Sequence, residues 1–274
     1  MTALPELLGD LDAEYNDLRR LVAPLAADAP EWDRATPAEG WAVRDQISHL
    51  AFFDDAGRMA MTEPETFAVY AEEAMARSGD PMAEHLARGR SIEGDALLSW
   101  WDGAHRGMMT AFAGADPTVR VPWFGPPMGV LSFISARLME TWAHGQDVAD
   151  ALGQERQPTD RLRHIAHLGV RARPFSYLVH GREVPTGCIE VVLAAPSGEL
   201  WRWEAGTADD GGTSASPSAA RVSGTALDFC LVVTQRRNIA DTGLVIDGEL
   251  AADWMSVAQA FAGPPGPGRP AGGM

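Results

Sequence analysis

The sequence predicts an α+β protein of two domains, a helical bundle followed by a smaller mixed domain. In the first half of the chain, apolar residues recur at helical spacing, whereas short strand-like runs occur in the second half. A chain of 274 residues with 46% hydrophobic side chains is also long enough for its core to divide in two. We therefore expect a helical domain over residues 1–153, a small α+β domain over 158–262 and a flexible tail over 263–274.

Four long amphipathic segments account for the helical domain. The first shows the pattern most clearly, because an apolar stripe begins at Leu4 and continues through Leu11 and Leu18 to Leu25. Gly153 ends the last segment, where a glycine commonly follows a helix. Four such helices in about 150 residues are typical of a four-helix bundle. The expected ranges are 3–27, from 43 to beyond 53, 92–113 and 129–152, with a further helical stretch near 65–77 in the long connection.

The pattern changes after residue 158. One or two helices are expected over 159–180, with an interruption at Pro174. The segment ELWRWEA then shows the alternation of a half-buried strand. The polar stretch DDGGTSASPS is typical of a loop. The remaining predictions are strands over 187–194, 199–205, 219–223 and 243–246, and helices over 225–235 and 248–261.

The basic residues exclude several kinds of enzyme. All 22 of them are arginine, since the sequence contains no lysine. A Schiff-base lysine and a Walker-type phosphate loop are therefore impossible. The two cysteines, Cys188 and Cys230, are too few for a four-thiolate zinc site or a disulfide scaffold. Any metal site must therefore consist of histidine and carboxylate ligands.

The charge of the chain bears on its partners. A net charge of -16 argues against nucleic acid or an anionic membrane as the main partner, because both require clustered positive charge. No segment approaches the ~20 apolar residues of a membrane span. The first residues, MTALPELLGDLDAEYNDL, carry acids where a signal peptide would be basic and then apolar. We expect a cytoplasmic protein, either a monomer or a homodimer.

Glu140 and His144 are the most informative candidate residues. Positions four apart lie on one face of a helix, so both side chains can reach one cation. The natural third ligand is His49, whose neighbours suggest that its helix packs into the bundle. Two imidazoles and one carboxylate are typical of a catalytic zinc or similar divalent site. The alternatives are an intrahelical hydrogen bond on a solvated face and a core histidine at position 49.

Two segments carry a family resemblance. GWAVRDQISHLAFFD resembles the second-helix motif of the DinB-like superfamily, specifically of its mycothiol-dependent maleylpyruvate isomerase branch, in which Trp41 and Val43-Arg44-Asp45 precede the histidine ligand His49. RLMETWAHGQDVADALG looks like the fourth helix of that branch. The resemblance implies that Glu140 and His144 are the other two ligands of a divalent metal, for which zinc is our first expectation.

The resemblance covers the first ~150 residues, and it also has implications for the second domain. It implies a small sterol-carrier-like α/β domain, from which an arginine faces the metal cleft. The stretch DFCLVVTQRRN is similar to the region that carries this residue, and Arg236 is the best match, with Arg237 as the alternative. Here Gln235 stands where the family usually has glycine. The other interpretation is that the two arginines only oppose the dipole of the preceding helix.

The function implied by the resemblance is thiol chemistry on a small molecule. Mycothiol, a low-molecular-weight thiol, would bind at the metal and attack an electrophile, with S-transfer or cis–trans isomerisation as the outcome. The arginine-only composition fits an actinobacterial, high-GC genome. Two alternatives stay open at this point. One is a metal-dependent hydrolase that uses activated water. The other is a non-catalytic module that binds a metal or another ligand.

Other residues have less specific predicted roles. Asp45 could orient His49 or could simply stabilise the start of its helix. His85 and His105 lie among polar residues and are expected at the surface. The aromatic loop 121–128 precedes the metal-bearing helix and could shape substrate access.

Overall fold

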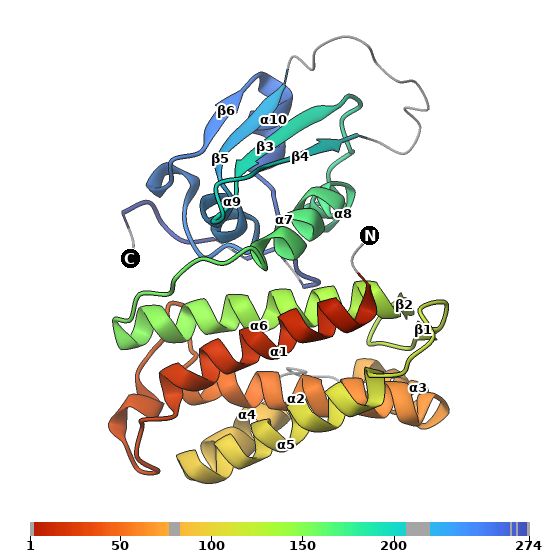
Figure 1. Ribbon diagram of the computed structural model, residues 1–274, viewed down its shortest axis with the longest axis vertical. Coiled ribbons are helices and arrows are strands. Elements are labelled where there is room, and N and C mark those ends of the chain that lie inside the picture. The colour runs from red at the N-terminus through yellow and green to blue at the C-terminus, as the bar shows by residue number, and fades with distance from the viewer. Residues whose placement is uncertain (1–2, 77–82, 207–219, 264, 267, 273–274) are drawn as a thin grey trace. The chain divides into compact units, whose positions relative to one another are not determined.

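The chain divides into two compact units, Met1–Arg156 and Gln157–Met274 (Figure 1). The structure is a computed structural model that describes residues 3–76, 83–206, 220–263, 265–266 and 268–272. The first unit is helical and the second combines helices with a sheet, so the predicted α+β fold class is confirmed. We describe each unit by itself.

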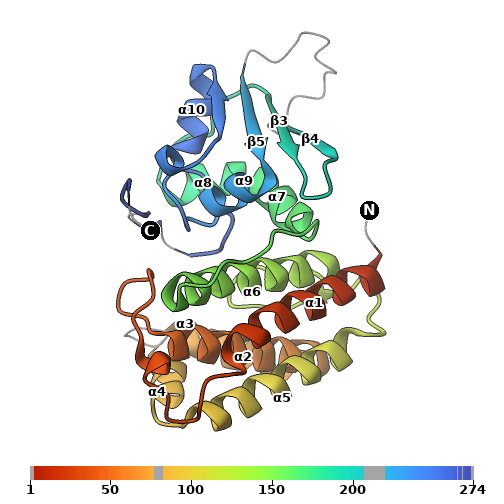
Figure 2. The ribbon, with the colours of Figure 1, turned by 60° about the vertical axis from the view of Figure 1, so that its left-hand side comes forward.

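Four long helices build the first unit. Both ribbon views show α1 beside α6, and α2 packs against α5 and α6 (Figures 1 and 2). Two shorter helices, α3 and α4, lie in the connection between α2 and α5 and pack on α2. The bounds are α1 Leu4–Val22, α2 Val43–Thr62, α3 Pro64–Ala76, α4 Ala83–Arg90, α5 Gly94–Phe112 and α6 Val130–Leu152, with short strands β1 Arg120–Val121 and β2 Met128–Gly129 paired before α6.

The apolar stripes seen in the sequence form the core of this bundle. Leu18 of α1, Ile47 of α2 and Trp101 of α5 are completely buried in one cluster. Trp32 joins them from the single turn η1, Pro30–Asp33, and its indole donates to the Ala26 carbonyl at 3.0 Å. The indole lies directly on Gly94, the first residue of α5, which has no side chain to obstruct it.

In the first unit, the helix predictions differ from the structure at two places. The first helix ends at Val22 rather than near residue 27, because Pro24 has no backbone N–H with which to continue the helical hydrogen bonds. α4 was not predicted, since its sequence AEHLARGR contains too few apolar residues to show a periodicity.

The second unit is built around a four-stranded sheet in the order β4-β3-β5-β6. β3 pairs antiparallel with β4 and parallel with β5, and β6 pairs antiparallel with β5. The helices α7 and α9 contact these strands. The bounds are α7 Leu162–Arg171, α8 Arg173–Val179, β3 Ile189–Ala194, β4 Leu200–Ala205, β5 Arg221–Thr225, α9 Ala226–Val233, β6 Val245–Asp247 and α10 Glu249–Met255, with a short turn η2 at Ile239–Asp241.

The sheet has a buried face and a face that carries charged residues. Val191, Trp201 and Val222 are buried. On the opposite face, Glu190 pairs with Arg202 at 2.9 Å and with Arg221 at 3.2 Å, which joins three neighbouring strands by charge. The alternation predicted for ELWRWEA is therefore present in β4, where burial changes from one residue to the next over its first three positions.

The last predicted helix is shorter than expected. α10 ends at Met255, and the chain beyond it hydrogen-bonds to other elements instead of continuing the helix. Gln259 N donates to Ser176 Oγ at 3.0 Å and Ala260 N donates to the Val233 carbonyl at 2.8 Å. The loop DDGGTSASPS lies outside the described residues. Within the described ranges, no helix is both long and apolar enough to cross a membrane.

Candidate metal centre

His49, Glu140 and His144 come together between α2 and α6. His144 Nε2 lies 3.1 Å from Glu140 Oε2, and His49 Nε2 lies 3.8 Å from the same oxygen. The two imidazole rings are 4.4 Å apart between centroids. One ligand atom from each residue lies within 4.8 Å of the other two, a spacing that one metal ion can bridge. The structure therefore brings together all three side chains that the sequence singled out.

The helices explain this convergence. Glu140 and His144 are one turn apart on α6, and their side chains share a face as the spacing predicts. α2 packs against α6 along the same face and supplies His49 from its second turn. The side chains of Glu140, His49 and His144 are 24%, 12% and 10% exposed, so the group is largely buried and partly open to solvent.

The pKa values favour the ligand forms of these residues. Burial, assisted by the neighbouring His144, lowers the pKa of His49 to about 3. Burial by itself would raise the pKa of Glu140, but contacts with the His144 and His49 rings outweigh it and hold that pKa well below its ordinary value. At neutral pH the group therefore offers a neutral His49 and a carboxylate, the forms in which these side chains bind cations. The residues present fit a divalent metal.

Aromatic rings surround the group. Trp41 lies 5.2 Å from the ring of His49 and stacks on His144 at 5.8 Å with an interplanar angle of 15°. Phe53 lies 4.6 Å from the ring of His49, and His85 lies 5.5 Å from it. These walls lower the local polarity, so a charge at the site interacts more strongly than it would in water.

Gln46 also contacts the group, which was not predicted from the sequence. His144 Nδ1 is hydrogen-bonded to Gln46 Oε1, and Gln46 Nε2 donates to Thr36 Oγ1 at 2.8 Å. Gln46 is completely buried. Its position three residues before His49 places it on the same side of α2, but a single glutamine in a helix carries no sequence signal for such a contact.

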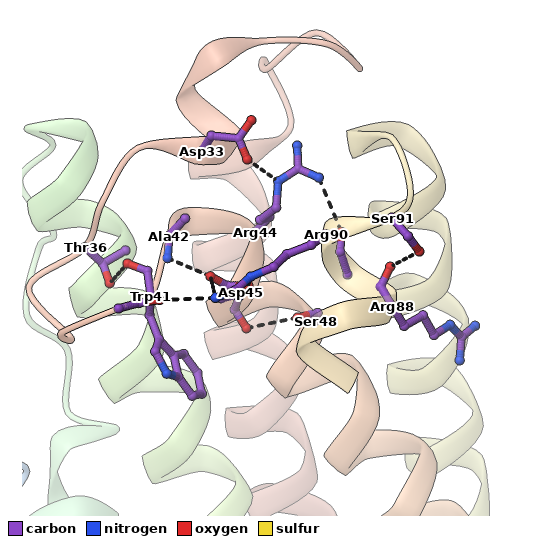
Figure 3. A network of polar contacts seen from close by, with 12 residues as sticks. Asp33, Thr36, Trp41, Ala42, Arg44, Asp45, Ser48, Arg88, Arg90 and Ser91 are labelled. Carbon is purple, nitrogen blue, oxygen red and sulfur yellow. Dashed lines mark hydrogen bonds and ion pairs between the residues drawn. The ribbon is translucent and has the colours of Figure 1, made fainter. Parts of the chain in front are cut away.

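Asp45 has the simpler of its two predicted roles. Its carboxylate accepts from Ala42 N at 2.9 Å at the start of α2, and from Arg90 Nε at 2.8 Å at the end of α4 (Figure 3). Arg44 beside it pairs with Asp33 at 2.7 Å. Asp45 therefore stabilises the first turn of α2 and holds α4 in place, and both oxygens of its carboxylate are engaged in these contacts.

The predicted surface positions of His85 and His105 are wrong. Their exposed fractions are 2% and 3%. His85 belongs to α4 and stacks on Phe52 at 4.7 Å. His105 stacks on Tyr15 at 3.9 Å and lies 3.1 Å from Asp12. Polar neighbours in the sequence were misleading, because successive residues of a helix point in different directions.

The loop 121–128 lies close to the aromatic wall of the site. Trp123 and Phe124 approach Phe53 with centroid distances of 5.9 Å and 5.7 Å. Together with Ala71 and Met75 of α3, they line a cavity of about 350 Å³. Phe53 therefore contacts both His49 and this loop. A role of the loop in substrate access stays a prediction.

Arg236 and Arg237 belong to the second unit and directly follow the end of α9. Arg236 donates to the Thr234 carbonyl at 2.7 Å. Gln235 has a φ of 60°, the left-handed conformation that glycine adopts most easily. The backbone there thus has the conformation that the family's usual glycine favours, although the residue differs. A contact of Arg236 with substrate or thiol stays a prediction.

Comparisons with known proteins agree with the sequence motifs. Residues 11–149 match the family described as the mycothiol maleylpyruvate isomerase N-terminal domain. An uncharacterized protein of Mycobacterium tuberculosis strain H37Rv is 44% identical over 266 residues, which cover 96% of this chain and 97% of that protein. The uncharacterized counterpart in strain CDC 1551 has the same values.

Solved structures show the same fold. A crystal structure of the mycothiol-dependent maleylpyruvate isomerase superimposes with a TM-score of 0.58 at 16% identity, over 89% of this chain and 93% of that one. A histidine-to-alanine mutant of the isomerase gives 0.56 at 17% identity, with the same coverage. The likeness extends through both units, so the arrangement of a helical domain followed by an α/β domain is shared.

Proposed function

This chain belongs to the mycothiol maleylpyruvate isomerase family, and from that premise we propose that it is a divalent-metal-dependent enzyme that uses a thiol of the mycothiol type. Its reaction would be S-transfer to a small electrophile, or isomerisation of one. The observation that carries this proposal is the convergence of His49, Glu140 and His144 within 4.8 Å, in ligand forms suited to a cation.

In this proposal the three residues hold one metal ion, most simply zinc. Two neutral imidazoles and one carboxylate leave a divalent ion with a net charge of about +1 and an open position. When bound, the metal supplies a Lewis acid beside which a thiol is held as thiolate at neutral pH. The carboxylate of Glu140 would offset one of the two positive charges of the metal. The rings of Trp41 and Phe53 would keep bulk water away from His49.

The cysteines support an external thiol. Cys230 is completely buried in α9, and burial raises the pKa of its thiol far above the usual range. It therefore stays protonated and out of reach of a substrate. Cys188 belongs to the second unit, just before β3. Since neither cysteine lies in the metal-bearing unit, the reactive sulfur is best supplied as a cosubstrate.

We propose a division of roles between the two parts of the chain. Residues 1–153 form the metal-binding domain and residues 158–262 a domain that contributes to substrate binding. Within the latter, Arg236 would pair with a carboxylate of the substrate or of the thiol, since guanidinium groups bind carboxylates in bidentate geometry. The family match over residues 11–149 supports the first assignment, and the fold shared with the isomerase structure over 89% of this chain supports the second.

The direct test is a conjugation assay with zinc-loaded protein, mycothiol and a model electrophile, read by mass spectrometry. We expect conjugate formation that disappears in His144→Ala and persists in His167→Ala, which replaces an exposed histidine of α7. A parallel assay follows the isomerisation of maleylpyruvate. Hydrolysis of the electrophile without any thiol would indicate a hydrolase instead. Absence of conjugation, isomerisation and hydrolysis would indicate a binding module.

A further inference from the structure

The buried side chain of Gln46 connects the metal centre to the loop before α2. It lies between His144 on one side and Thr36 on the other, and it is completely shielded from solvent. Thr36 and Trp41 belong to the same loop, and Thr36 Oγ1 donates to the Trp41 carbonyl at 2.9 Å. Four groups thus form one chain of hydrogen bonds, from a backbone carbonyl to the imidazole.

The Trp41 carbonyl fixes the direction of every hydrogen bond in this series. Trp41 O can only accept, so the proton between it and Thr36 Oγ1 belongs to Thr36. Thr36 Oγ1 must then accept from its other neighbour, which must be the NH₂ group of Gln46. With the amide reversed, the threonine proton would point to Gln46. Thr36 Oγ1 and Trp41 O would then be 2.9 Å apart with no proton between them.

The orientation of the amide determines the proton on His144. Gln46 Oε1 faces His144 Nδ1, and an amide oxygen only accepts, so Nδ1 carries the proton. The other ring nitrogen, Nε2, points to Glu140 Oε2 at 3.1 Å. In the neutral ring Nε2 is an acceptor, and it faces a carboxylate that is also an acceptor. A cation bound by both atoms resolves this conflict, as does a second proton on the ring.

We infer that Gln46 is a positioning residue, which holds His144 in the Nδ1-protonated form so that Nε2 is available to a metal. This inference rests on the metal site proposed above. Outer hydrogen bonds of this kind orient metal-bound histidines and fix their tautomer. His49 has no equivalent support, because its Nδ1 is buried without a hydrogen-bond partner among the described residues.

The test compares four variants by zinc affinity, measured in competition with a chelator. Gln46→Met removes the acceptor at similar volume, and we expect zinc binding to weaken about 10–100-fold. Gln46→Glu keeps an oxygen for Nδ1 and should retain most of the affinity. Thr36→Val removes the hydroxyl that orients the amide and should weaken binding, whereas Thr36→Ser should not.

Ser48→Ala is the matched control. Ser48 is as buried as Gln46 and lies on the same helix, and its hydroxyl donates to the Asp45 carbonyl. We expect its zinc affinity to stay within about twofold of wild type, since it lies outside the hydrogen-bond chain to His144. Equal affinity in Gln46→Met and Ser48→Ala would overturn the inference.

A second measurement needs no variant of Gln46. Nitrogen NMR of histidine-labelled wild-type protein, with the His144 signals assigned by their loss in His144→Gln, reports which ring nitrogen is protonated. We expect a proton on Nδ1 both with and without Zn²⁺. An unprotonated Nδ1 would contradict the inference even if zinc binds. A protonated Nδ1 in a protein that binds no zinc would contradict only the proposed metal site.

Discussion

Arg137 of α6 and Asp54 of α2 form a buried ion pair, in which Nε and one terminal nitrogen of the guanidinium donate to Asp54 Oδ1 at 3.1 Å and 2.9 Å. Their side chains are 4% and 3% exposed. Arg137 lies three residues before Glu140, and Asp54 lies five residues after His49. The pair therefore joins the two helices that carry the candidate metal ligands.

Replacing one partner of this pair should destabilise the protein strongly. Arg137→Met leaves the Asp54 carboxyl buried, where burial already raises its pKa, and we expect a loss of about 3–5 kcal/mol in the free energy of unfolding. The double variant Asp54→Leu/Arg137→Met should recover much of this loss, because it removes both polar groups. Urea unfolding of the three proteins measures the effect. A loss below about 1 kcal/mol in the single variant would contradict the prediction.

Zinc should stabilise the protein. A ligand that binds only the folded state adds about 2.7 kcal/mol when its free concentration is 100 times its dissociation constant. We expect an increase in melting temperature with Zn²⁺ that is reversed by a chelator. His49→Ala and Glu140→Ala should not respond, whereas His167→Ala should respond like wild type. A shift that survives in both ligand variants would place the zinc elsewhere.

The metal-free protein should become less stable as the pH falls below about 6.5. The pKa of His49 is about 3 in the folded chain and close to 6.5 when unfolded, so the unfolded chain binds an additional proton between these values. Its contribution to stability is complete above the unfolded pKa and is lost progressively on acidification. The lowered pKa of Glu140 affects the stability only at lower pH, since the pKa of this side chain in the unfolded chain is about 4.5.

Urea unfolding between pH ~5 and ~7 tests this expectation, because histidines are the side chains whose ordinary pKa lies in that range. His49→Asn should show a shallower pH dependence than wild type in the presence of a chelator. Identical slopes for the two proteins would show that His49 does not titrate as the structure indicates.

Two glycines of α5 should respond oppositely to alanine. A Cβ atom at Gly94 would lie 2.1 Å from Trp32 Nε1, so Gly94→Ala must displace a buried indole and should cost about 1–3 kcal/mol. Gly103 is exposed and has nothing within 4 Å, so Gly103→Ala should stabilise the helix by about 0.4–1 kcal/mol. Thermal unfolding distinguishes the two, and a loss of stability in Gly103→Ala would be unexpected.

Arg173 should be essential to the second unit. Its buried guanidinium donates to the carbonyls of Gly187 at 2.9 Å, Ala205 at 2.6 Å and Pro185 at 2.8 Å. Arg173→Met leaves these acceptors without their partner, at about 1–3 kcal/mol for each group that stays buried. We expect a lower unfolding midpoint, measured by denaturant titration. Arg202→Met, on the exposed face of β4, should change it by less than about 0.5 kcal/mol.

Local spacing in the sequence was sufficient for the long helices and for part of the candidate site. The last bundle helix was expected at 129–152 and spans Val130–Leu152, because apolar periodicity and a terminal glycine are local signals. α4 and the early end of α10 were missed, since neither is determined by periodicity. The ion pair of Arg90 with Asp45 fixes the end of α4. Hydrogen bonds to Ser176 and to the Val233 carbonyl fix the chain after α10.

The sequence by itself determined which chemistry was possible and placed two of the three candidate ligands side by side. Without lysine and with two cysteines, histidine and carboxylate were the remaining ligands, and helical geometry placed Glu140 beside His144. Only the tertiary structure decided that Gln46 bonds to His144, 98 positions away, and that His105 faces the core. Such contacts depend on how α2, α5 and α6 pack, which no short stretch of sequence encodes.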